Sequence, residues 1–104
     1  MKDFIKVLIK RPGHAPELEL IENTLESLQQ KVLGYIETVT LAPGITIICN
    51  EEGILLDLPW NCYLNGVDFF GPIIICGTKG DEFADLSEKN IRIMTTLLGG
   101  YEDD

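Results

Sequence analysis

Residues 45–61, ITIICNEEGILLDLPWN, constrain the fold more than any other part of the chain. Two apolar runs flank a polar turn, and a Pro-Trp-Asn corner follows them. Short apolar runs rich in β-branched residues and joined by a glycine-containing loop are typical of a β-hairpin. We therefore predict a hairpin with arms at residues 45–49 and 54–56, in which Gly53 takes a positive φ angle at the end of the loop.

The first part of the chain predicts two strands, a helix and a further strand. Residues 3–10 are apolar on both faces, which indicates a covered strand with lysines at its margins. Residues 14–20 end in alternating Glu and Leu, as expected of an exposed strand that pairs with the first. Asn23 and Glu26 have the capping-box spacing that begins a helix. Residues 35–41, rich in β-branched side chains, then predict another strand.

The last part of the chain completes an α+β pattern. Residues 57–64 have no clean period and predict a turn or short helical segment, whereas residues 73–76 are apolar throughout and predict a buried strand. Ser87 is placed to cap a final helix. We expect a mainly antiparallel sheet of four to six strands with two helices packed on one face. The predicted domain spans residues 1–100, and residues 101–104 form a mobile acidic tail.

Composition narrows the class of protein. Of 104 residues, 45% are hydrophobic, which is enough to bury a core. No apolar run approaches the roughly 20 residues that cross a bilayer, and Lys6 interrupts the N-terminal run, which also lacks a cleavage site. We therefore expect a cytoplasmic protein without membrane contact.

The charge balance bears on the partner. A net charge of −9, from 17 acidic and 8 basic residues, disfavours direct nucleic-acid binding. Two interpretations of the acidity stay open. It either keeps the protein soluble or forms a surface that competes with nucleic acid for a basic partner.

The residues that usually carry chemistry do not form a recognisable catalytic or metal site. The three cysteines are odd in number and contain no Cys-x-x-Cys pair: Cys49, Cys62 and Cys76. Such thiols are typical of a reduced cytosolic protein, and their spacing to the lone His14 matches no zinc pattern. Glu51 and Glu52 form the one obvious carboxylate pair, but adjacent residues on a loop usually point apart into water. We predict no catalytic residues, no metal and no cofactor.

One polar and aromatic cluster is a candidate binding site. Trp60 would supply stacking area, while Asn50, Asn61 and Tyr63 would supply directed hydrogen bonds. The competing interpretation is structural, with Trp60 half-buried and Asn61 bonded to neighbouring backbone. Both interpretations remain open from the sequence.

Several segments resemble one known family. They are IKVLI with a following Pro-Gly, ENTLESLQ with a following GYIE, ICNEEG with a following LPWN, then GPIIICG and LSEKN. This arrangement is similar to the domain-of-unknown-function family 3846, small proteins of phages and mobile elements, and extends from Ile5 to about Leu97. In the family the Leu-Pro-x-Asn segment is usually followed by a basic residue, where this chain has Cys62. The resemblance implies a bacterial host cell as the setting and no catalytic mechanism.

Three functional hypotheses follow. The first is a non-enzymatic inhibitor that binds a host defence macromolecule, most simply a host protein. The second is a small-ligand binder that sequesters a nucleotide-like signal at the Trp60–Asn61 corner. The third is a structural or assembly module whose exposed strand edge recruits a second chain, including a second copy of itself.

Overall fold

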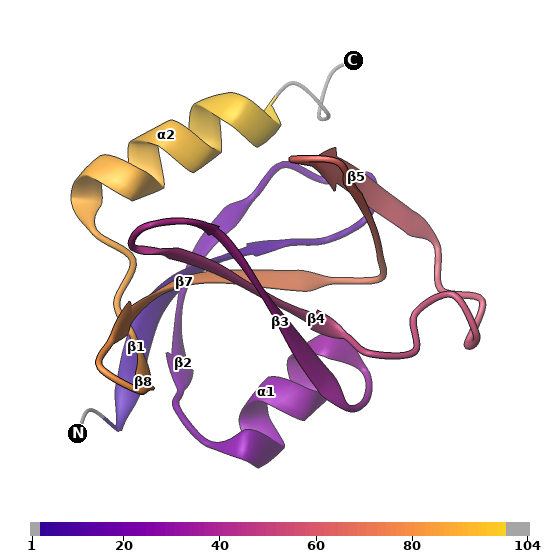
Figure 1. Ribbon diagram of the computed structural model, residues 1–104, viewed down its shortest axis with the longest axis horizontal. Coiled ribbons are helices and arrows are strands. Elements are labelled where there is room, and N and C mark those ends of the chain that lie inside the picture. The colour runs from indigo at the N-terminus through magenta and orange to yellow at the C-terminus, as the bar shows by residue number, and fades with distance from the viewer. Residues whose placement is uncertain (1–2, 100–104) are drawn as a thin grey trace.

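A computed structural model describes residues 3–99, which form eight strands and two helices (Figure 1). In chain order these are β1 (Phe4–Lys10), β2 (Glu17–Glu22), α1 (Leu25–Val32), β3 (Ile36–Ala42), β4 (Ile45–Asn50), β5 (Trp60–Leu64), β6 (Val67–Phe70), β7 (Ile73–Lys79), β8 (Glu82–Ala84) and α2 (Glu88–Leu98). The predicted mobile tail at residues 101–104 lies outside the described residues.

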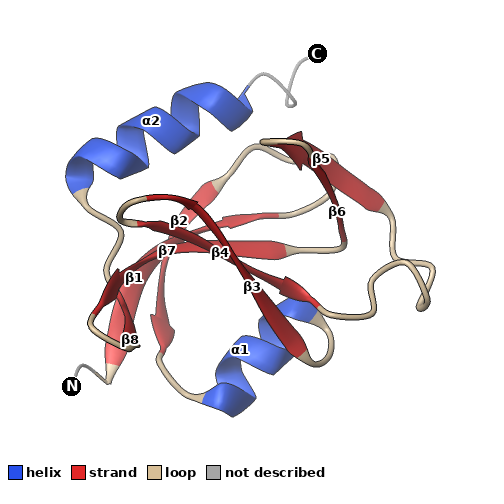
Figure 2. Ribbon diagram, in the orientation of Figure 1, coloured by secondary structure: helices blue, strands red, loops and turns tan. Residues whose placement is uncertain are grey.

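The strands form a large antiparallel sheet and a small one (Figure 2). The large sheet has six strands in the order β2-β1-β7-β4-β3, with β8 paired to β7, and the small sheet consists of β5 and β6. All of the pairings are antiparallel. The predicted α+β class, with a mainly antiparallel sheet and two helices, is therefore confirmed.

The two helices lie on opposite faces of the large sheet, so their predicted placement on one face is wrong (Figure 1). Helix α1 packs Val32 into the core cluster that contains Ile48, whereas α2 packs Met94 into the cluster that contains Ile47. Neighbouring residues of a strand point to opposite faces. Because the central strands are apolar on both faces, each face needs its own cover.

The predicted hairpin of residues 45–49 and 54–56 does not form. Strand β4 instead pairs with β3 on one side and β7 on the other. Residues 51–57 form consecutive turns, in which the Leu56 amide donates to the Glu52 carbonyl. A strand with two neighbours has no free edge for a third, so residues 54–56 cannot pair with it.

Gly53 does not adopt the predicted positive φ angle, and its role in the loop is a different one. A Cβ atom at this position would lie 2.9 Å from the carbonyl oxygen of Phe70. The glycine therefore permits the loop to approach the backbone of β6 closely.

Residues 60–64 form strand β5, where the sequence predicted a turn or short helical segment. The turn to β6 uses Asn65 and Gly66, with φ angles of 50° and 83°, as expected of a tight hairpin turn. The register shifts between Trp60 and Cys62, which is a β-bulge at Asn61. This bulge hid the alternating pattern of the strand from sequence inspection.

Each helix begins after a residue whose side chain accepts a hydrogen bond from a backbone amide of the first turn. Thr24, not the predicted Asn23, caps α1 by accepting a hydrogen bond from the amide of Ser27. The Asn23 side chain donates instead to the carbonyl of Phe83. The predicted cap of the second helix is confirmed, because the Ser87 hydroxyl accepts from the Asn90 amide. Within the described residues, neither helix has the length and apolar character that crossing a membrane requires.

Candidate functional site

Asn61, the centre of the predicted recognition corner, is buried and fully hydrogen-bonded within the protein. Its Oδ1 atom accepts from the Lys10 ammonium at 3.0 Å, and its Nδ2 atom donates to the carbonyls of Lys10 and Gly71 at 2.7 and 2.8 Å. Lys10 was expected at a strand margin but is also buried, and desolvation lowers its pKa. Asn61 therefore ties the small sheet to the end of β1.

Asn50 is buried as well and organises the chain where β4 ends. Its Nδ2 atom donates to the carbonyl of Val32 at 3.0 Å, and its Oδ1 atom accepts from the amide of Glu52 at 2.6 Å. The second bond is the Asx-type contact that starts a turn. Asn50 thus joins helix α1, strand β4 and the following loop.

Trp60 and Tyr63 lie on the exposed outer face of the small sheet, 46% and 56% exposed. The bulge at Asn61 brings both to the same side of β5, and the Trp60 Nε1 atom donates to the Asp68 carboxylate at 2.9 Å. The predicted corner is thus split into two inward-facing amides and two outward-facing aromatic rings. Of the four residues, Asn50 alone is among those that line the pocket described next.

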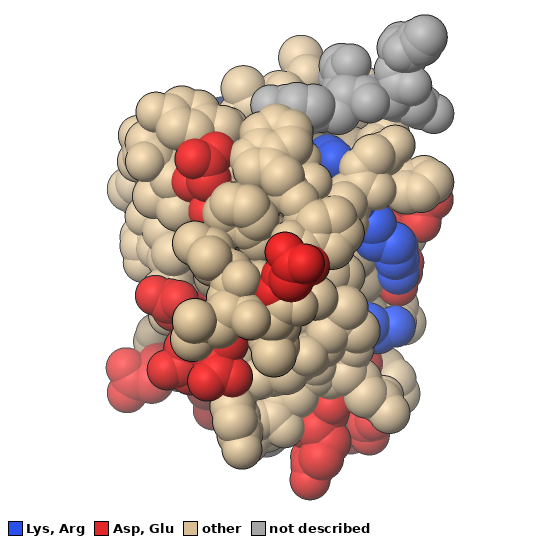
Figure 3. All heavy atoms as spheres, turned by 90° about the vertical axis from the view of Figure 1, so that its right-hand side faces the viewer, with Lys and Arg blue, Asp and Glu red and all other residues tan. Residues whose placement is uncertain are grey.

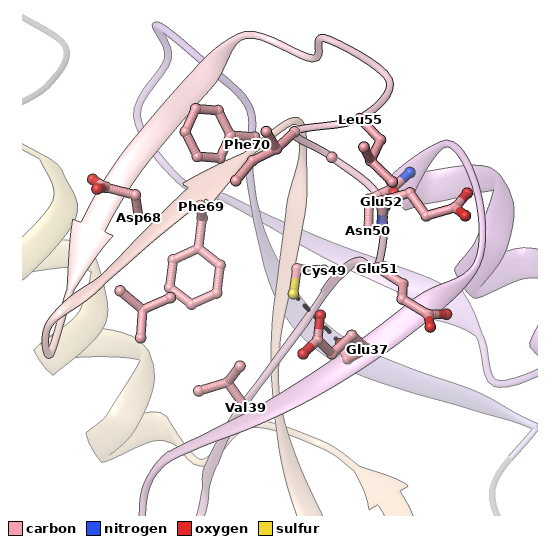
Figure 4. Close-up of a pocket in the computed structure, with 13 residues that line it drawn as sticks. Glu37, Val39, Cys49, Asn50, Glu51, Glu52, Leu55, Asp68, Phe69 and Phe70 are labelled. Atoms are coloured by element: carbon pink, nitrogen blue, oxygen red, sulfur yellow. Dashed lines mark hydrogen bonds between the residues drawn. The ribbon is translucent and has the colours of Figure 1, made fainter.

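A pocket of about 340 Å³ lies between β3, β4, β6 and the loop that follows β4 (Figure 4). Val39, Cys49 and Phe69 lie close together in this view, where they form an apolar floor. The Cys49 thiol donates to the Glu37 carbonyl at 3.6 Å, and burial raises its pKa to about 11. At neutral pH the floor of the pocket therefore carries no charge.

The rim of the pocket is acidic. Glu37, Glu51 and Glu52, called the acidic rim below, all line it, and no lysine or arginine is among its described lining residues. Asp68 also lines the pocket, but its carboxylate points away in Figure 4 and accepts from Trp60. On the face turned toward the viewer in Figure 3, acidic side chains are scattered over the surface, one of them near its centre, and basic side chains lie along one margin.

An exposed apolar segment borders the same opening. Ile54, Leu55 and Leu56, called the apolar loop below, are 73%, 83% and 51% exposed, and the first two line the pocket. Single exposed leucines are common on protein surfaces, but three consecutive aliphatic side chains beside a pocket are unusual and typical of an interaction site. Sequence inspection missed this role because it assigned these residues to a hairpin.

The pocket is built from segments that are distant in sequence, which explains why sequence inspection did not identify it. Glu37 and Phe69 come from strands in different sheets. The one available signal was local: Gly53 alone separates two glutamates from an Ile-Leu-Leu run, and Asp57 follows that run.

The other two cysteines are buried. Burial raises the pKa of the Cys62 thiol to about 11 and that of the Cys76 thiol to about 12, so both are protonated at neutral pH. Among residues 3–99, no group of three or more His, Cys, Asp or Glu side chains is arranged to hold a metal ion.

Comparison with known proteins yields a family assignment. No curated protein and no solved structure matches the chain. The model of one family, DUF3846, described as a domain of unknown function, matches residues 5–99. This match confirms the family that the sequence resembles, while the phage and mobile-element setting stays a prediction. Since the matched residues include every strand and helix of the fold except the first residue of β1, the chain belongs to the DUF3846 family.

Proposed function

We propose that this protein is a non-enzymatic binding protein that holds a basic segment of a partner protein in the pocket between β3, β4 and β6. The observation that carries the proposal is the combination of an apolar floor with an acidic rim and no lysine or arginine among the described residues that line the pocket. Lysine and arginine side chains have the matching chemistry, because an apolar stem carries a positive head. The stem would lie over Val39 and Phe69, and the head would reach Glu37.

The charge of the whole chain supports the same class of partner. A net charge of −9 attracts basic proteins over long distances and accelerates their association. It repels phosphate groups, so a nucleotide-like signal fits this pocket poorly. Two copies of the chain would also bring two acidic rims together, which disfavours self-association through this surface.

The apolar loop favours a protein over a small cation as the ligand. Leu55 is 83% exposed, and burial of such a side chain contributes up to about 2 kcal/mol to an interface. Apolar anchors beside a charged rim are the usual arrangement of a protein interface. In the setting that the family resemblance implies, the partner would be a host defence protein, whose basic surface this chain would cover.

The experiment is a selection of random displayed peptides on the full chain. We expect recovered peptides to combine lysine or arginine with apolar residues. A double charge reversal of the rim, Glu37→Lys with Glu51→Lys, should weaken the best peptide at least about tenfold. The double change Asp81→Lys with Glu82→Lys, at exposed positions in and next to the β7–β8 turn, alters the net charge equally, so it is the matched control and should leave most of the affinity.

Two outcomes would contradict the proposal. One is a set of recovered peptides with no enrichment in basic residues over the starting library. The other is equal affinity of the best peptide for the unaltered chain and the rim variant, with the fold of both verified by circular dichroism.

A further inference from the structure

We propose that the basic segment binds as an added β-strand along the free edge of β3, which places alternate side chains of the segment at the pocket. This inference rests on the proposed function and specifies its geometry. Strand addition supplies affinity through main-chain hydrogen bonds and selectivity through alternate side chains.

Strand β3 ends the large sheet. In the order β2-β1-β7-β4-β3, it has β4 as its one neighbour among the described residues. An edge strand presents a row of amide and carbonyl groups that another chain can pair with. Strand β3 also contributes Glu37 and Val39 to the pocket, so this edge and the candidate site belong to one surface.

The backbone hydrogen bonds show which groups face outward. The Glu51 amide donates to the Tyr35 carbonyl at 2.8 Å, so the pair 35–51 is hydrogen-bonded. Such pairs alternate along an antiparallel ladder, and the next ones are Glu37 with Cys49 and Val39 with Ile47. The amides and carbonyls of residues 36, 38 and 40 therefore point away from β4, toward the free edge.

The side chains follow the matching alternation. Glu37 and Val39 point to the pocket side of the sheet, and Thr38 points to the other side. In an added strand, the residues opposite Glu37 and Val39 would also point to the pocket side. Neighbouring strands lie about 4.8 Å apart, so a lysine or arginine at these positions can extend over Val39.

Two features restrict where the segment can bind. The register of β3 and β4 shifts between Thr40 and Ala42, which limits regular pairing to residues 36–40. Strand β2, at the opposite end of the β2-β1-β7-β4-β3 order, carries Glu17 and Glu19, but both already pair with Arg11. A basic segment is therefore attracted to the edge of β3 more strongly than to that of β2.

The test is amide hydrogen exchange by NMR, with and without the highest-affinity peptide from the display selection. We expect the exchange of the Thr38 and Thr40 amides to slow at least about tenfold on binding. The Glu37 and Val39 amides, already bonded to β4, provide the internal control and should change little. Methylation of alternate backbone nitrogens of the peptide should abolish binding for one set of positions and preserve it for the other.

The outcomes separate the two proposals. Strand addition is overturned if the peptide binds through the acidic rim while Thr38 and Thr40 exchange at their free rates and both methylated peptides bind equally. That result would leave the proposed function intact. Insensitivity of binding to Glu37→Lys with Glu51→Lys would overturn the proposed function, whatever the exchange data show.

Discussion

Strand β4 and the apolar loop are two aliphatic segments only a few residues apart, but the first is buried and the second is exposed. All six residues of β4 are buried, with Ile47 and Ile48 0% exposed. In the apolar loop, Ile54 and Leu55 are 73% and 83% exposed. Strand β4 has a neighbouring strand on each side and a packed core on each face, whereas the loop has neither.

The difference teaches that pairing partners, and not hydrophobicity alone, decide which aliphatic segment becomes core. A surface run such as the apolar loop carries a cost in solubility, because exposed aliphatic patches promote association. Its position beside the acidic rim is consistent with a binding role. The contrast between the two segments can be tested by substitution, beginning with the change that should have the largest effect.

Substitution in the two segments should differ sharply in its effect on stability. Ile48→Ala removes a fully buried side chain and should lower the free energy of unfolding by about 3–4 kcal/mol. Leu55→Ala should change it by less than about 0.5 kcal/mol. Urea denaturation of both variants measures the difference. Similar losses in the two variants would show that the apolar loop contributes to the core as β4 does.

The junction between the segments should have an intermediate effect. Asn50→Ala removes the hydrogen bonds to Val32 and Glu52 and should lower the free energy of unfolding by about 1–2 kcal/mol. The peptide selected on the unaltered chain should also bind less tightly, because the loop loses its anchor. Asn90→Ala, which removes a longer exposed bond of 3.4 Å to Gly44, is the control and should be close to neutral. Equal destabilisation by the two changes would argue against a special role for the junction.

Alkaline pH should lower the free energy of unfolding through the buried thiol of Cys76. Burial raises the pKa of Cys76 from 9.0 to about 12, so above pH 9 the unfolded chain loses this proton while the folded chain keeps it. The stability contribution of Cys76 is therefore complete below pH 9 and falls as the pH rises toward 12. At pH 10 the loss should be about 1 kcal/mol.

A variant isolates this thiol. The stability of Cys76→Ala should fall less steeply between pH 8 and 10 than that of the unaltered chain, as measured by urea denaturation at each pH. Lys10 has the opposite sign, since its lowered pKa makes its contribution rise toward pH 10.5, but it is present in both proteins and cancels in the difference. Parallel pH profiles would exclude the assigned role of Cys76.

Local signals in the sequence predicted much of the fold. The Ile-rich run at 73–76 and the Ser87 cap each depend on a few adjacent residues, and both are confirmed. The hairpin at 45–56 was wrong because β4 finds its partners in β3 and in the distant β7. Non-local pairing of this kind leaves no local trace.

The candidate site was less predictable for the same reason. Asn50 was predicted as a binding residue, and it does line the pocket. Its side chain, however, forms hydrogen bonds with the backbone of Val32 and Glu52. Asn61 sits at a bulge, and its buried bond to Lys10 joins residues that are 51 positions apart. Neither burial nor an acidic rim assembled from separate strands can be deduced from spacing along the chain.

The central position of β7 has a consequence for how the chain is made. The pairs β1–β2 and β3–β4 join strands that are close in sequence, whereas β7 joins them by pairing with β1 and β4, as in the match of Leu8 with Ile75. Before residues 73–79 leave the ribosome, β1 and β4 each have one unpaired edge rich in isoleucine and valine. At that stage the nascent chain is most prone to aggregation. This tendency falls when β7 pairs with β1 and β4 and completes the sheet.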